Sequence, residues 1–159
     1  MMEWLKNIFG QKTVRKFALC KDAPLSAILP TRTTKYSAGY DFYLTEDVII
    51  QPHSYSAPIP TYVKAYMPQD EVLLLFIRSS IGFKKGVTLA NNVGVIDSDY
   101  VDNEDNEGNI GLKLYNHTDH VVKFYQGERI MQGIFLKYGV VSNDFADTER
   151  KGGTGSTGK

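Results

Sequence analysis

Short runs of β-branched and aromatic residues, each ended by a turn signal, constrain the fold of this chain more than any other feature. Four such runs have the length and composition of strands: Asp47–Ile50, Tyr62–Tyr66, Val72–Ile77 and Val121–Tyr125. Turn signals such as Gln51-Pro52 separate them, and no long helical period occurs. The pattern predicts an all-β domain, either a sandwich or a barrel.

Two further segments and the chain length complete this outline. Ile110–Tyr115 alternates apolar with other residues, which predicts a half-buried strand, and Ser79–Lys85 is the one place where a short helix is expected. With 159 residues, 42% of them hydrophobic, the chain is long enough for one domain with a real core. We divide it into an N-terminal appendage at 1–16, a β domain at 17–145 and a flexible glycine-rich arm at 146–159.

The N-terminal appendage carries Trp4, Leu5, Ile8 and Phe9 at helix-like spacing. Its apolar run is too short for a secretion signal or a membrane span. We expect it to pack on the body or on a neighbouring subunit. A helix lying on a membrane surface is the less favoured alternative, because the segment is brief and has few positive charges.

Charge and cysteine content limit the partners. Lys plus Arg and Asp plus Glu both number 18, so the net charge is zero and neither a nucleic-acid nor a membrane partner is expected. The single cysteine, Cys20, allows no internal disulfide, which suits a reducing cytoplasm.

The segment Asn91–Tyr100 joins an apolar strand to polar side chains at its end. An apolar strand that delivers Asp97 to its mouth can desolvate this carboxylate, which suits a general base that orients one water. Asn91 offers an amide for reading a base edge, and Tyr100 offers a flat ring for packing on a sugar. Taken alone, the segment is more typical of a strand that stops at a polar turn.

Three further polar clusters accompany this segment. Arg78-Ser79-Ser80 opens the expected helix, where free amides, two hydroxyls and a guanidinium would form a good phosphate cradle. Ala38–Asp41 places small residues before an acid, and Arg129–Gln132 follows a turn. In isolation the first is more often a helix N-cap, and the last an ordinary hairpin.

The tail Gly153–Lys159 has the spacing of a P-loop, but we reject that assignment. A P-loop follows a strand, opens a helix and places Ser or Thr after its Lys, and no residue follows Lys159 in this sequence. We expect an arm whose backbone amides close over an anion, with Arg150 adding charge. A disordered terminus is the alternative.

Together, the order and spacing of these clusters resemble the five motifs of the trimeric deoxyuridine triphosphatases (dUTPases). In this chain the motifs read Ala38–Asp41, Arg78–Ser80, Asn91–Tyr100, Arg129–Gln132 and Arg150 with Gly153–Gly158. The resemblance implies a jelly-roll-like, distorted β-barrel and a homotrimer whose active sites are shared between subunits. It also implies hydrolysis of dUTP to dUMP and pyrophosphate with Mg²⁺.

The same resemblance implies a role for each site residue. Asp97 would be the general base that orients the water attacking the α-phosphorus, and Tyr100 would pack against deoxyribose where a 2′-hydroxyl would clash. Asp41 would help to place Mg²⁺ through its waters. The other expected substrate-binding residues are Arg78, Ser79, Ser80 and Gln132 at the phosphates, Asn91 with the hairpin at Gly94 and Ile96 at uracil, and Arg150, Gly153, Thr154, Gly155 and Ser156 in the arm.

Two departures from the family pattern affect the arm and the hairpin. Thr154 replaces the usual tail aromatic, and because stacking on a base contributes about 1–3 kcal/mol, we expect a weaker lid with a higher KM or faster release. The insertion 101–107 holds four carboxylates in seven residues, and we expect a solvated loop. A calcium site is disfavoured because the loop lacks the register of one.

Two other functions remain as alternatives. Deoxycytidine triphosphate deaminases share this fold and carry a catalytic glutamate in I-x-L-E-L, but Ile110–Leu114 has Lys113 at that position, so deamination is disfavoured. The second alternative is a dUTP-binding regulatory role in which the insertion 101–107 docks a protein partner.

Overall fold

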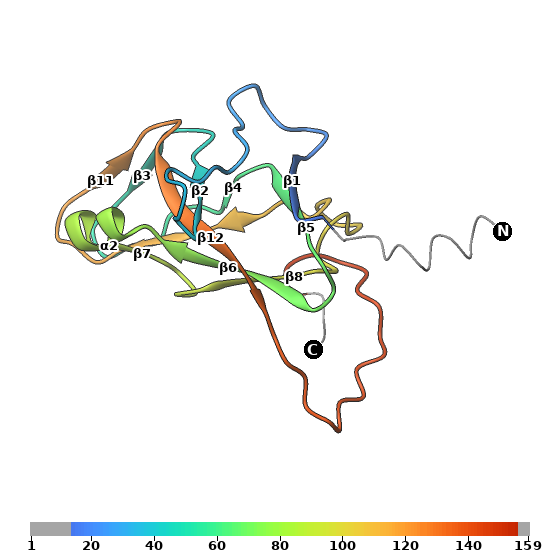
Figure 1. The fold of residues 1–159 in the computed structure, drawn as a ribbon. Helices are drawn as coiled ribbons and strands as arrows, with labels where there is room; N and C mark the ends of the chain where they lie inside the picture. The colour runs from blue at the N-terminus through green and yellow to red at the C-terminus, as the bar shows by residue number, and fades with distance from the viewer. Residues whose placement is uncertain (1–13, 156–159) are drawn as a thin grey trace.

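The computed structural model describes residues 14–155 and is mostly β (Figure 1). A helix, α2 (Ser79–Lys85), follows the longest of the early strands at the residues expected for it. The strands are β1 (Lys16–Leu19), β2 (Tyr40–Tyr43), β3 (Val48–Ile50), β4 (Ile59–Pro60), β5 (Val63–Tyr66), β6 (Glu71–Ile77), β7 (Val87–Leu89), β8 (Gly94–Asp97), β9 (Gly111–Leu112), β10 (Leu114–Asn116), β11 (Val122–Phe124) and β12 (Arg129–Lys137).

Antiparallel pairing arranges these strands in one four-stranded and four two-stranded sheets. The four-stranded sheet has the order β2-β12-β6-β8, and the pairs are β1-β5, β3-β11, β4-β9 and β7-β10. The all-β, jelly-roll-like fold is confirmed. Across residues 14–155, however, the hydrogen-bonded strands do not close into one continuous barrel.

The expected strand at Ile110–Tyr115 is divided because its partner changes. Ile59 pairs with Leu112, whereas Leu89 pairs with Leu114. The backbone carbonyl of Lys113, between the two strands, accepts a hydrogen bond from Ala90 N at 2.8 Å. The alternating burial that the sequence predicts is nevertheless kept through both strands.

The core lies between the sheets, and the four-stranded sheet contributes much of it. Its fully or almost fully buried side chains include Phe42, Leu73, Leu75, Ile130 and Met131. Burying a side chain of this kind contributes about 1.5–3 kcal/mol. The sheet that carries the polar motifs is therefore a firm support for them.

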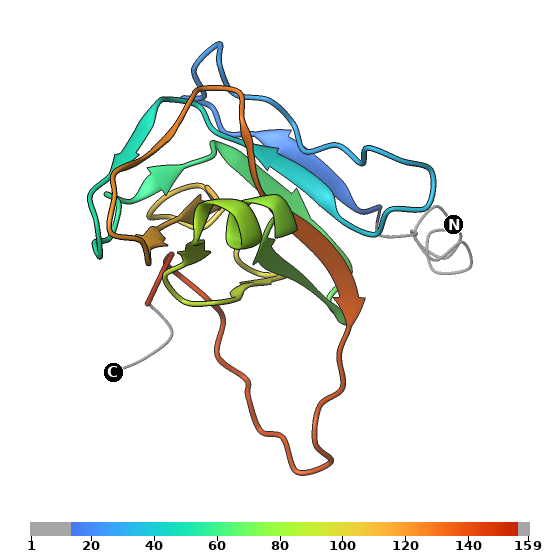
Figure 2. The same cartoon turned by 90° about the vertical axis from the view of Figure 1, so that its left-hand side faces the viewer.

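The chain leaves the body after β12 and returns to it. Residues 138–149 form a long exposed loop that projects away from the strands and comes back beside β8 (Figures 1 and 2). Predicted segment 1–16 lies almost wholly outside the described residues, and the boundary at 145 stays a prediction. Within the described residues, no helix has the length and apolarity needed to span a membrane.

Candidate active site

The four-stranded sheet carries four of the five motifs, and its register gathers three of them. Asp41 on β2 lies opposite Gln132 on β12, and Gln132 lies opposite Phe76 near the end of β6. Arg78 follows that end of β6 and precedes α2. The first, second and fourth motifs therefore meet at one end of the sheet.

At this end of the sheet a buried carboxylate lies between two guanidinium groups. We call these three residues, Asp41, Arg78 and Arg129, the arginine cluster. Asp41 Oδ1 lies 3.0 Å from Arg78 Nε, and Asp41 Oδ2 lies 3.1 Å from Arg129 Nη1. Thr33 Oγ1 also donates to Asp41 Oδ2 at 3.0 Å. The cluster holds two positive charges against one negative charge, which favours an anionic ligand.

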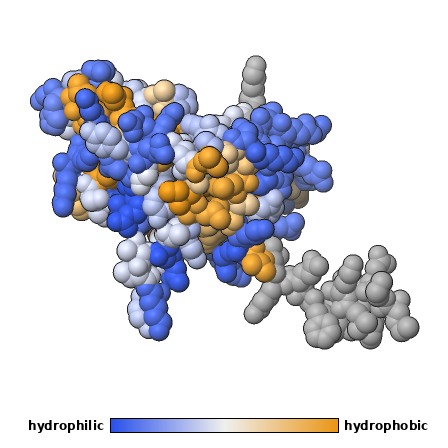
Figure 3. Space-filling view, turned by 90° about the horizontal axis from the view of Figure 1, so that it is seen from above, coloured by the Kyte–Doolittle hydropathy of each residue, from blue (hydrophilic) through white to orange (hydrophobic). Residues whose placement is uncertain are grey.

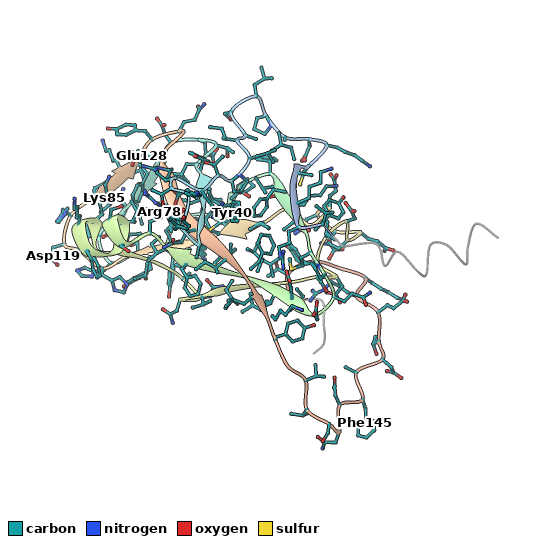
Figure 4. All side chains as sticks on the ribbon, in the orientation of Figure 1. Tyr40, Arg78, Lys85, Asp119, Glu128 and Phe145 are labelled. Carbon is teal, nitrogen blue, oxygen red and sulfur yellow. The ribbon has the colours of Figure 1, made fainter. Side chains whose placement is uncertain are left out.

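The surroundings of the arginine cluster add hydroxyls and positive charge. Arg78 has an extended backbone and no side-chain cap on α2, and Ser79 and Ser80 are exposed. Arg78, Ser80, Lys84 and Lys85 line a shared pocket, and Figure 4 shows Arg78 and Lys85 on the same side of the molecule. We had not predicted Lys84, Lys85 or Arg129 as site residues. The two adjacent lysines at the end of the expected helix were the sequence signal that could have indicated this positive charge.

The first and fourth motifs pack closely at Gly39. A Cβ atom on Gly39 would lie 2.4 Å from Gln132 Oε1, closer than real Cβ contacts allow. The small residues before Asp41 therefore make room for the Gln132 side chain.

The third motif and the arm meet elsewhere, at a second pocket of about 630 Å³ that we call the β8 pocket. Its size suits a small-molecule ligand. Eight predicted site residues line it: Asn91, Gly94, Ile96, Asp97, Tyr100, Arg150, Thr154 and Gly155. Asn106, Asn109 and Lys113 also line it and were not predicted as site residues.

Asp97 is the last residue of β8, and its side chain is 53% exposed. The prediction that the strand desolvates this carboxylate is therefore wrong for a single chain. An ion pair orients it instead. Arg150 Nη2 donates to Asp97 Oδ2 at 2.7 Å, and Arg150 Nε donates to Asp99 Oδ1 at 2.8 Å. The guanidinium also lies 5.7 Å from the centre of the Tyr100 ring. The arm therefore supplies the cation that faces the candidate base.

The arginine cluster and the β8 pocket lie at opposite ends of β6. Asp97 is paired with Val72 near the start of this strand, whereas Arg78 follows its last residue. Six residues of extended chain separate Val72 from Arg78, which corresponds to about 20 Å at about 3.3 Å per residue. A triphosphate is much shorter than this separation between the two backbone positions.

The insertion 101–107 is a turn-rich loop in which Asp102, Glu104 and Asp105 are exposed, as expected, but it is also tied to the body of the domain. Lys64 Nζ donates to Asp102 Oδ1 at 2.6 Å and to Glu107 Oε1 at 2.7 Å, and the Lys64 side chain is 10% exposed. Tyr66 donates to Asp102 Oδ2 at 2.7 Å. The paired carboxylates raise the pKa of Lys64, and its ammonium lowers the pKa of Asp102 and of Glu107. Two of the four acids are thus tied to β5.

Replacing Lys64 by Met is expected to lower the Tm near pH 7 by about 3–8 °C, because two charged hydrogen bonds are lost. A carboxyl group whose pKa is lowered by folding stabilises the fold at pH values above its unfolded pKa of about 4. This stabilisation is lost as the pH falls through the pKa of the folded state. The raised pKa of Lys64 stabilises the fold at pH values below the unfolded pKa of lysine, about 10.4. The Tm difference should therefore persist from about pH 5 to 10 and shrink in acid.

Thermal unfolding followed at several pH values measures this difference. Lys123→Met, at an exposed position on β11, is the matched control and should change the Tm little. A Lys64 variant as stable as the wild type at pH 7 would contradict the prediction.

The arm rests on the insertion as well as on β8. Gly153 N donates to Asp105 Oδ2 at 2.7 Å, and Glu104 N donates to Lys151 O at 3.2 Å. Thr154 is exposed and lines the β8 pocket, while the predicted site residue Ser156 lies outside the described residues. A weaker lid caused by Thr154 stays a prediction.

The described side chains suit a cation that is bound mainly by a phosphate ligand and only indirectly by the protein. The described residues contain no group of three His, Cys, Asp or Glu side chains suited to a metal ion, and each Asp41 oxygen is in an ion pair with an arginine. Mg²⁺ commonly binds one or two carboxylates, phosphate oxygens and several waters. An ion placed through water, as predicted for Asp41, is compatible with this arrangement.

Known proteins resemble this chain over most of its length. The family model described as dUTPase matches residues 26–158. A deoxyuridine 5'-triphosphate nucleotidohydrolase of Lactococcus lactis subsp. lactis is 46% identical and covers 96% of this chain and 99% of its own. The dUTPase of Streptococcus mutans superposes with a TM-score of 0.74 at 43% identity, covering 80% of this chain and 98% of its own.

A phage protein shares the fold at lower identity. The dUTPase from phage phi11 of S. aureus, whose structure describes the coordination of a structural Mg(II) ion, has a TM-score of 0.68 at 20% identity. It covers 85% of this chain and 97% of its own.

Proposed function

The chain belongs to the dUTPase family and is a dUTP nucleotidohydrolase, and on this premise we propose how its residues divide the reaction. Asp97 accepts a proton from a water molecule, which attacks the α-phosphorus. The bond from that phosphorus to the bridging oxygen breaks, and dUMP and pyrophosphate leave. The presence of Asp97 in the β8 pocket, beside Tyr100 and Asn91, is the observation that supports this assignment best.

The β8 pocket binds the nucleoside in this proposal. The hairpin with Asn91, Gly94 and Ile96 reads uracil, and Tyr100 packs against the sugar. Tyr100 is only 8% exposed, so a ring held in this way leaves little room for a 2′-hydroxyl. This arrangement accounts for selection of both the base and the sugar.

The arginine cluster, with Ser79, Ser80 and Gln132, binds the phosphates in this proposal. Phosphoryl transfer needs charge neutralisation and in-line geometry more than covalent help, and guanidinium and amide donors supply both. Mg²⁺ on the triphosphate would neutralise further charge, with Asp41 holding its waters. Arg150 and the amides of Gly153 and Gly155 close the arm over the ligand.

The distance between the two parts supports sites shared between copies of the chain, for which we propose a homotrimer. Because Asp97 and Arg78 of one chain are about 20 Å apart along β6, a complete site takes each from a different copy. Figure 3 shows an apolar patch on the face seen from above. Exposed apolar side chains of this kind are typical of interaction surfaces.

Pyrophosphate release from dUTP, dCTP, dTTP and UTP, each with Mg²⁺, tests the proposal. We expect release from dUTP alone, because the hairpin reads the base and Tyr100 reads the sugar. Formation of dUMP from dCTP would instead support the deaminase alternative, which Lys113 in the β8 pocket disfavours. Equal release from dUTP and UTP would contradict the role of Tyr100.

The regulatory alternative and the cellular location stay predictions. The insertion 101–107 uses Asp102, Asp105 and Glu107 for contacts within its own chain. Among its described acids, Glu104 is left with no side-chain hydrogen bond or ion pair. A docking role therefore has less exposed charge available than the sequence implied. Cys20 is buried and its pKa is raised to about 11 by that burial, which is compatible with the proposed reducing cytoplasm.

A further inference from the structure

The insertion 101–107 contributes a side chain to the β8 pocket although it lies outside the five motifs. Asn106 lines this pocket, and its Nδ2 donates to the Tyr100 hydroxyl at 2.8 Å. The hydroxyl donates in turn to the backbone oxygen of Asn109 at 3.2 Å. The outer end of the Tyr100 ring is therefore held between the insertion and the backbone of Asn109, shortly before β9.

Asn106 is itself fixed by a second asparagine. Its Oδ1 accepts hydrogen bonds from Asn103 Nδ2 at 2.7 Å and from Gly108 N at 3.0 Å. Asn103 is buried; its Nδ2 also donates to Tyr100 O at 2.8 Å, and its Oδ1 accepts from the backbone of Asp105 and Asn106. A side-chain amide that is hydrogen-bonded at both its oxygen and its nitrogen has one orientation. Asn106 therefore presents its Nδ2 as a fixed donor to the Tyr100 hydroxyl.

The same hydroxyl also faces the arm. Thr154 Oγ1 lies 3.5 Å from the Tyr100 hydroxyl, and Gly153, the residue before it, donates to Asp105 in the insertion. The insertion therefore contacts both the ring and the arm segment in which Thr154 replaces an aromatic residue.

We propose that Asn106 is a positioning residue for Tyr100 and that it sets how strongly the enzyme rejects ribonucleotides. This inference rests on the dUTP hydrolysis proposed above. A ring anchored at its hydroxyl cannot move aside for a 2′-hydroxyl, whereas an unanchored ring can relieve that clash. Because specificity is a difference between two transition-state affinities, loss of the anchor reduces it.

The ratio of kcat/KM for dUTP to kcat/KM for UTP measures this effect. Asn106→Ala is expected to lower the ratio about three- to tenfold, as loss of one partly buried hydrogen bond does. Tyr100→Phe removes the same hydrogen bond from its other side and should lower the ratio by a similar factor. Asn106→Ala added to Tyr100→Phe should then change the ratio less than about twofold, since both act through one contact.

Glu104→Ala, in the same insertion and with an exposed side chain, is the matched control and should leave the ratio unchanged. An unchanged ratio in Asn106→Ala or in Tyr100→Phe would overturn the proposal, and so would independent effects in the double variant. Tyr100→Phe leaves the insertion intact but also removes the hydrogen bond to Asn109 O, so an unchanged ratio in this variant overturns the proposal even when Asn106→Ala does not fold. A wild-type protein that fails to hydrolyse dUTP would contradict the proposed function instead, so the two failures are distinguishable.

Discussion

Asp97→Asn is expected to lower kcat for dUTP by about 100- to 10,000-fold, the contribution of a positioned general base. The amide keeps the size and the hydrogen-bonding oxygen of the carboxylate but cannot accept a proton from water at neutral pH. Binding of a non-hydrolysable dUTP analogue should remain within a few-fold of wild type, because Asn91, Tyr100 and the phosphate-binding residues are unchanged. Pyrophosphate release and titration calorimetry measure the two quantities.

Asp99→Asn separates this chemical effect from an effect on the arm. Asp97 and Asp99 both pair with Arg150, at 2.7 Å and 2.8 Å, so each variant removes the negative charge of one of these ion pairs. We expect only a few-fold loss of activity for Asp99→Asn. Comparable losses in both variants would assign the effect to the arm and would contradict the role of Asp97 as the base.

Mixing two inactive variants is expected to restore activity. Arg78→Ala should fail at the phosphates and Asp97→Asn at the chemical step, and each alone should form only inactive sites. If a site combines Asp97 of one copy with Arg78 of another, random mixing at equal amounts leaves about a quarter of the sites intact. Co-refolding the two variants and measuring pyrophosphate release against wild type tests this expectation.

Arg78→Ala mixed with Gln132→Ala is the control for this experiment. Both residues lie at the same end of the sheet in one chain, so no mixed site contains both intact and activity should not return. Absence of recovery in the Arg78→Ala and Asp97→Asn mixture, with subunit exchange demonstrated, would place the whole site within one chain. That outcome would contradict the argument from the length of β6.

Several strands and the helix were predictable because they depend on local patterns. β3, β5, β6 and β11 overlap the expected runs, and α2 spans the predicted residues, since composition and turn residues act over a few positions. The split of Ile110–Tyr115 was not predictable, because a strand ends where its partner changes and the partner is distant in sequence.

The sequence by itself determined the residue types of the site, their order along the chain and the all-β class. Only the tertiary structure decided which of them meet. Asp41 lies beside Arg129 because β2 pairs with β12, and Asp97 lies far from Arg78 because β8 pairs with the beginning of β6. Lys64 converts acids of the insertion from a solvated run into part of the fold, and Asn106 reaches Tyr100. Strand register and long-range ion pairs are set by packing across the whole domain, so no local stretch of sequence contains them.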